Sequence, residues 1–103
     1  MDPLGRVYIL LPDFTVVAGY VGDKCDDMYR IDIDEQKISI FGGRSVYRRQ
    51  DDIFYDEKVA RARKFMKRFK MMLRTGHTMD EAWASESNEI TELAINLWPE
   101  ELL

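Results

Sequence analysis

Two short segments match a pattern that carries metal-dependent chemistry. Pro12-Asp13 and then Glu35-Gln36-Lys37 fit the Pro-Asp…Glu-x-Lys pattern of metal-dependent nucleases. In that pattern the carboxylates hold Mg²⁺, and the lysine helps to position or activate the attacking water. The pattern is common by chance, and Glu35 and Lys37 fall at a predicted hairpin turn rather than inside a strand. We therefore interpret both segments as surface turns, and keep a nuclease only as a minor alternative.

A second group of carboxylates lies in the polar stretch 22–27, beside the lone Cys25: Asp23, Asp26 and Asp27. Three carboxylates could hold Ca²⁺, but their spacing does not match an EF-hand loop. The single histidine, His77, is far from Cys25 in the sequence, which argues against a zinc site and against an activated cysteine nucleophile. The stretch is therefore expected to be a solvated loop. We predict no catalytic residue, no metal and no cofactor, and hence a protein that is not an enzyme.

Charge is sorted along the second half of the chain. Between residues 58 and 74 there are eight basic residues and no acidic one: Lys58, Arg61, Arg63, Lys64, Lys67, Arg68, Lys70 and Arg74. From residue 76 to the end there are seven acidic residues and no lysine or arginine. Helices of opposite sign attract each other, so part of this sorting can be internal to the fold. Any basic surface that remains exposed predicts a partner-binding site.

The candidate partner-binding residues lie on this basic helix and on a strand that precedes it. They are Arg61, Lys64, Lys67, Arg68 and Lys70 on the helix, with Arg44, Arg48 and Tyr47 on the strand. Such a face suits a protein with an acidic surface, and nucleic acid is the alternative, because lysine and arginine release counterions when they meet phosphates. A helix-turn-helix is disfavoured, because the helix after the turn is acidic. The competing interpretation is that the basic face pairs with the acidic helix and is otherwise solvated.

The first half of the chain has the apolar pattern of strands. Residues 7–11 and 14–21 are rich in β-branched and aromatic side chains, and Gly19 marks a bulge or close packing. Apolar and polar residues then alternate over 30–34 and 37–40, with a short link that predicts a hairpin, and a further strand is expected at 45–48. Five short strands with close turns predict an antiparallel meander, either an open sheet or a small barrel.

The second half has the apolar pattern of helices. Asp56 can cap a helix that Gly76 terminates, and Thr78 with Glu81 matches a capping box that starts the next helical segment. Residues 79–98 form either one helix or two, and Pro99 ends them. A short link predicts that the helices form an antiparallel hairpin. The chain is thus expected to be one α+β domain over 1–103, with a β-rich part at 1–55 and a helical part at 56–103.

Composition narrows the class of function. The 103 residues carry a net charge of −4, with 33% charged and 46% hydrophobic side chains, as in soluble globular domains. No apolar run approaches the roughly 18 residues of a membrane span, and the N-terminus lacks the pattern of a signal peptide. We therefore expect a cytoplasmic protein, including one made in a host cytoplasm. The size and charge favour a small non-enzymatic protein-binding module, a regulator or inhibitor such as the accessory proteins of phages and mobile elements.

Overall fold

The computed structural model of the chain describes residues 5–34 and 45–102. The chain divides into two compact units, Met1–Glu57 and Lys58–Leu103. The first is built on a sheet and the second on helices, so the predicted α+β class is confirmed. The unit boundary lies close to the predicted limit of the β-rich part. The single domain over 1–103 stays a prediction.

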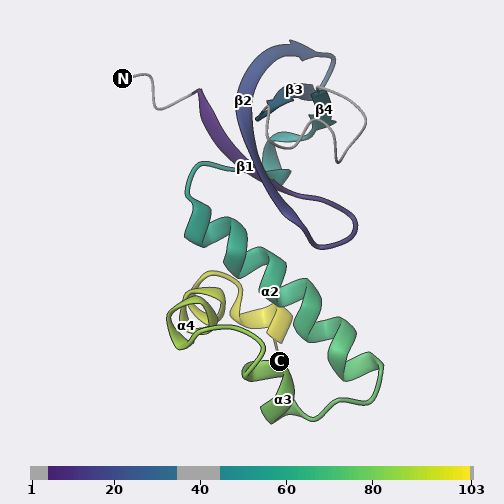
Figure 1. The fold of residues 1–103 in the computed structure, drawn as a ribbon, viewed down its shortest axis with the longest axis vertical. Coiled ribbons are helices and arrows are strands. Elements are labelled where there is room, and N and C mark those ends of the chain that lie inside the picture. The colour runs from purple at the N-terminus through teal and green to yellow at the C-terminus, as the bar shows by residue number, and fades with distance from the viewer. Residues whose placement is uncertain (1–4, 35–44, 103) are drawn as a thin grey trace. The chain divides into compact units, whose positions relative to one another are not determined.

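The first unit holds an open antiparallel sheet of five strands in the order β4-β3-β2-β1-β5 (Figure 1). Their bounds are β1 Arg6–Leu10, β2 Val16–Cys25, β3 Met28–Ile33, β4 Ser45–Arg48 and β5 Ile53–Phe54. Strands β1 to β4 form the predicted meander. After the 3-10 helix η1, Gln50–Asp52, β5 returns to the free edge of β1. The predicted strand at 37–40 and its hairpin turn lie outside the described residues.

The sheet buries one face of alternating side chains. Its core is aliphatic and mostly β-branched: Val7, Ile9, Leu11, Val17, Ile31, Ile33 and Ile53. Gly19 lies between Val7 on β1 and Ile33 on β3 in the register. A Cβ atom at Gly19 would come within 2.5 Å of the Asp32 carbonyl oxygen, so this position requires glycine. The close packing predicted at Gly19 is confirmed.

The prediction of a polar loop over residues 22–27 is wrong. Strand β2 continues through this stretch to Cys25, and only Asp26 and Asp27 separate it from β3. Asp26 has a positive φ of 56°, a conformation that aspartate tolerates in tight turns. The tip of this hairpin buries no side chain, so the apolar alternation that would reveal a strand is absent there.

The second unit contains α2 Glu57–Arg74, α3 Met79–Trp83, α4 Asn88–Leu97 and the 3-10 helix η2 Pro99–Leu102. The predicted stop at Gly76 is confirmed by its φ of 97°, and the capping box is confirmed by both hydrogen bonds between Thr78 and Glu81. Residues 79–98 form two helices, because Ser87 caps a new helix at α4. In Figure 1, α4 is seen nearly end-on while α2 lies across the view, so these helices cross rather than run alongside each other.

An aromatic cluster forms the core of the helical unit. Phe65, Phe69 and Trp83 have ring centroids 4.8 to 5.7 Å apart. Alanine and larger aliphatic side chains fill the remaining space, namely Ala62, Met66, Ala82, Ile90, Ala94 and Leu102. Among residues 5–34 and 45–102, no helix combines the length and apolar content needed to cross a membrane.

Candidate partner-binding surface

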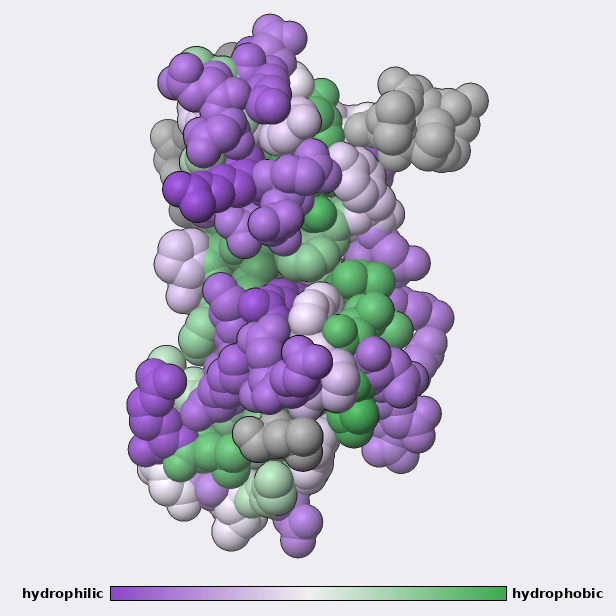
Figure 2. All heavy atoms as spheres, turned by 180° about the vertical axis from the view of Figure 1, so that it is seen from behind, coloured by the Kyte–Doolittle hydropathy of each residue, from purple (hydrophilic) through white to green (hydrophobic). Residues whose placement is uncertain are grey.

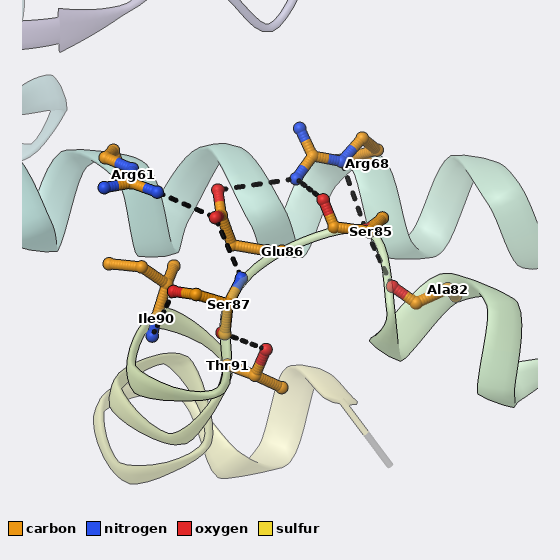
Figure 3. A network of polar contacts seen from close by, with 8 residues as sticks. All are labelled: Arg61, Arg68, Ala82, Ser85, Glu86, Ser87, Ile90 and Thr91. Carbon is orange, nitrogen blue, oxygen red and sulfur yellow. Dashed lines mark hydrogen bonds and ion pairs between the residues drawn. The ribbon is translucent and has the colours of Figure 1, made fainter.

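Glu86 pairs with two arginines on one flank of α2. Its carboxylate accepts a hydrogen bond from Arg61 at 2.7 Å and lies 3.6 Å from the Arg68 guanidinium (Figure 3). Arg61 and Arg68 are seven residues apart, so they lie on the same side of the helix about two turns from each other. The Glu86 side chain is only 15% exposed. One carboxylate from the connection between α3 and α4 thus contacts two arginines of α2.

The surroundings of Glu86 favour its charged form. Burial alone would raise the pKa of Glu86, but the Ser87 amide, the Arg61 hydrogen bond and the charges of Arg61 and Arg68 outweigh burial and hold the pKa below its ordinary value. Arg68 also donates to the Ser85 carbonyl at 2.9 Å, which fixes the turn before α4 (Figure 3). The network therefore positions the α3–α4 connection on α2.

Glu101 does the same on the opposite flank. Arg63 and Lys70, again seven residues apart, each donate to Glu101 at 2.8 Å. The Lys70 hydrogen bond and then the Arg63 hydrogen bond lower the pKa of Glu101. The Arg63 guanidinium also lies 5.2 Å from the centroid of the Trp98 ring. These contacts hold η2 against α2.

A third glutamate pairs with the first cation of α2. Lys58 donates to Glu89, and this hydrogen bond lowers the pKa of Glu89. Five of the eight cations of α2 are therefore bonded to the acidic half of the chain. Much of the charge sorting seen in the sequence serves to hold the helical unit together. Three residues of the predicted binding set, Arg61, Arg68 and Lys70, take part in this pairing.

The remaining three cations, Lys64, Lys67 and Arg74, share one face of α2 with Met71, and we call these four residues the outer stripe. By helical geometry these residues lie opposite the buried side chains of Phe65, Met66 and Phe69. Lys67 and Arg74 are exposed, Met71 is 39% exposed and Lys64 is partly buried. In the part of the chain that the structure describes, no acidic side chain forms an ion pair with the three cations of the stripe.

The outer stripe only partly coincides with the predicted set. It contains Lys64 and Lys67, and it adds Arg74 and Met71. The signal for it is visible in the sequence, because the four residues recur at steps of three, four and three. Sequence reasoning missed it because the pairing of the other cations depends on which glutamates reach α2. On the face of the molecule drawn in Figure 2, hydrophobic side chains form patches among hydrophilic ones.

The strand residues of the predicted set belong to the first unit. Tyr47 on β4 is 48% exposed, and Arg48 donates to the Tyr47 carbonyl at 2.7 Å. Arg44 lies outside the described residues. The strand residues therefore belong to one unit and the α2 residues to the other.

The exposed face of the sheet carries cations that are already paired. Arg6 bonds Asp34 at 2.9 Å and lies over the rings of Tyr8 and Tyr20. Arg30 bonds Asp32 at 3.1 Å and covers Gly22, where an added Cβ would come within 2.5 Å of the guanidinium. This face has a balanced charge, so it lacks the excess positive potential that attracts phosphates.

Of the two segments that match the nuclease pattern, only Pro12-Asp13 lies among the described residues. Asp13 accepts a hydrogen bond from the Thr15 amide at 3.1 Å, which is a turn geometry, while Glu35 and Lys37 lie outside the described residues. In residues 5–34 and 45–102, no three histidine, cysteine or acidic side chains are grouped so as to hold a metal ion.

Comparisons with protein-family models, with curated proteins and with solved structures each returned no match.

Proposed function

We propose that the chain is a small non-enzymatic protein-binding module that docks an acidic surface of a larger protein through the outer stripe of α2. In this role it regulates or inhibits that protein, as small accessory proteins of phages and mobile elements do. The observation that carries the proposal is the division of the α2 cations. The flanking cations are bonded internally, whereas Lys67 and Arg74 point away from the core beside an exposed methionine.

The chemistry of the stripe favours protein over nucleic acid. Methionine is flexible and polarisable, so it adapts to an apolar partner surface, and arginine is enriched at protein interfaces. Phosphate binding is favoured by a continuous basic surface. Here Glu86 and Glu101 each pair with two flanking cations, which halves the positive charge on either side of the stripe.

Affinity capture with two charge-matched variants tests the proposal. The purified chain and its Lys67→Glu/Arg74→Glu variant are used to capture partners from extracts of the source cell, with and without nuclease. The control, Lys24→Glu/Arg49→Glu, makes the same change in net charge on exposed residues of the first unit. We expect a specific protein to be captured by the parent chain and by the control but not by the Lys67/Arg74 variant.

The captured protein must then bind the purified chain with a defined stoichiometry in isothermal titration calorimetry. Capture that disappears with nuclease would support the nucleic-acid alternative. Equal capture by all three chains would place the interface away from the outer stripe and overturn the proposal.

A further inference from the structure

Strand β4 lies at one edge of the sheet, and the register shows which of its main-chain groups face outward. The amide of Asp34, just after β3, donates to the Ala18 carbonyl at 3.1 Å, so Asp34 directs its main-chain groups toward β2. These directions alternate along a strand, so Ile31 directs its groups the other way, toward its partner Val46 on β4. Val46 therefore faces β3, and the residues on either side of it direct their main-chain groups out of the sheet.

These two outward residues are Ser45 and Tyr47. Within residues 5–34 and 45–102, no strand pairs with the outer side of β4. An open edge of this kind can add a strand from another chain, and proteins protect such edges with short strands or charged side chains. The opposite edge of the sheet ends in β5, which has only two residues. Strand β4 has four residues and ends in an arginine.

This arginine, Arg48, covers one of the outward groups. Its guanidinium donates to the Tyr47 carbonyl at 2.7 Å. Its own main-chain groups face the other way, toward Tyr29 on β3. Arg48 thus belongs to the ladder through its backbone and occupies the edge through its side chain. A strand added at this edge would have to displace a charged hydrogen-bond donor to reach the same carbonyl.

Without that donor, the edge is complementary to a second copy of itself. If two β4 strands lie antiparallel about a twofold axis at Val46, Ser45 of each copy is opposite Tyr47 of the other. Opposite residues that direct their amides and carbonyls at each other exchange two hydrogen bonds. Val46 packs against the aliphatic core of the sheet, so this core would continue across the contact from one copy to the other.

We propose that Arg48 closes the open edge of β4, and that removal of its side chain lets two copies of the chain pair through this edge. The observation behind the proposal is the hydrogen bond from Arg48 to a carbonyl that points out of the sheet. The inference is independent of the proposed function, because the outer stripe lies on α2 in the other unit.

Sedimentation equilibrium of the intact chain and its Arg48→Ala variant tests the proposal. Arg49→Ala is the matched control, since it removes the same charge from the next residue, which is exposed. We expect Arg48→Ala to dimerise at least about tenfold more tightly than the parent chain and the control, which corresponds to about 1.4 kcal/mol. Arg48→Thr repeats the test with a residue that favours strands. Equal association of all these chains would overturn the proposal.

Two double variants show whether the dimer uses this edge. Arg48→Ala/Tyr47→Pro removes the outward amide of residue 47 without removing a hydrogen bond to β3, so it should associate as weakly as the parent chain. Arg48→Ala/Tyr47→Ala lacks the same ring but keeps the amide, so it should remain dimeric. Circular dichroism checks that each variant keeps its fold. A dimer that survived Tyr47→Pro would use another surface and would overturn the proposal.

Hydrogen exchange in the parent chain tests the open edge directly. The Tyr47 amide points outward, so it should exchange at least about tenfold faster than the Val46 amide, which faces β3. Nuclear magnetic resonance resolves both amides. In the Arg48→Ala dimer, exchange at Tyr47 should become slow. Slow exchange at Tyr47 in the monomeric parent chain would mean that the edge is already covered, and this result would also overturn the proposal.

Discussion

Different interactions stabilise the sheet unit and the helical unit, each within itself. Neighbouring strands are joined by main-chain hydrogen bonds, so the ion pairs of Arg6 and Arg30 lie on an exposed face of a sheet whose register the backbone already fixes. Helices satisfy most of their main-chain groups internally, so side chains must join one helix to the next. In the helical unit this is done by an aromatic core and by glutamates that reach cations up to 38 residues away in the sequence.

This difference changes how sorted charge is interpreted. A basic segment followed by an acidic one can indicate a binding surface. In a helical unit the same pattern also allows ion pairs between helices. The cations that indicate a binding surface are those that form no ion pair within the unit. On α2 these are the cations of the outer stripe.

The aromatic core of the helical unit should give the largest effect. Phe69→Ala should reduce the free energy of unfolding by about 3–5 kcal/mol, because it leaves a cavity against Phe65 and Trp83. Ile31→Val in the sheet core should cost only about 0.5–1.5 kcal/mol. Urea unfolding followed by tryptophan fluorescence measures the effect of Phe69→Ala, since both tryptophans belong to the helical unit. Circular dichroism measures the effect of Ile31→Val. A loss below about 1 kcal/mol for Phe69→Ala would contradict the aromatic core.

The Glu86 network should give the next largest effect. Glu86→Gln should reduce stability by about 1–2 kcal/mol, because Arg61 and Arg68 lose a largely buried charged partner. Glu92→Gln is the matched control, since Glu92 is an exposed residue of α4 with no ion pair among those that the structure shows. Equal unfolding midpoints for the two variants in urea would mean that the network contributes no stability.

Acid should weaken the helical unit through the same glutamates. The pKa of Glu86 and that of Glu101 are both lowered in the folded chain. Their stabilising contribution is therefore complete above the unfolded pKa of about 4.3, and it is lost as the pH falls through the lower folded values. Tryptophan-monitored urea unfolding from pH 6 to pH 3 should show this decline, and the double variant Glu86→Gln/Glu101→Gln should show a shallower one. If the stability of the parent chain and that of the double variant fell equally with pH, the two carboxylates would not have this role.

Removing the capping box should have a moderate effect. Thr78→Ala should reduce stability by about 1 kcal/mol, because the Glu81 amide loses its side-chain acceptor, while Thr78→Ser should be nearly neutral. Thermal unfolding compares the two variants. If both unfold at the same temperature as the parent chain, the hydroxyl does not stabilise the start of α3.

The outer stripe should give the smallest effect on stability. Lys67→Glu/Arg74→Glu should change the free energy of unfolding by less than about 0.5 kcal/mol, because neither side chain forms an ion pair among the described residues. Arg61→Glu should be clearly destabilising, because it places two acidic side chains together at Glu86. If the stripe variant were the less stable of the two in urea, the division between flanks and stripe would be wrong.

The elements that local sequence determines could be predicted. Apolar alternation gave the central strands, and the Thr78 capping box and Gly76 are signals that act over a few residues. The last residues of β2 could not be predicted, because Asp23 to Cys25 bury nothing and are held by the hairpin alone. Strand β5 has only two residues, too few for any period to show.

The candidate site was harder to predict, because it consists of the α2 cations that form no ion pair within the helical unit. That α2 is basic could be seen from its composition. Which of its cations are used internally depends on the break between α3 and α4, which turns Glu86 toward Arg61 and Arg68. The strand positions Arg48 and Tyr47 belong to the first unit, whereas the outer stripe belongs to the second.

The sharing of each glutamate by two cations also constrains how the sequence can evolve. Replacement of Glu86 leaves Arg61 and Arg68 both without this partner, and replacement of Glu101 does the same to Arg63 and Lys70. A tolerated change at either glutamate is therefore expected to come with compensating changes at two positions seven residues apart. Distant relatives of this chain should keep that three-residue covariation even where overall identity has faded.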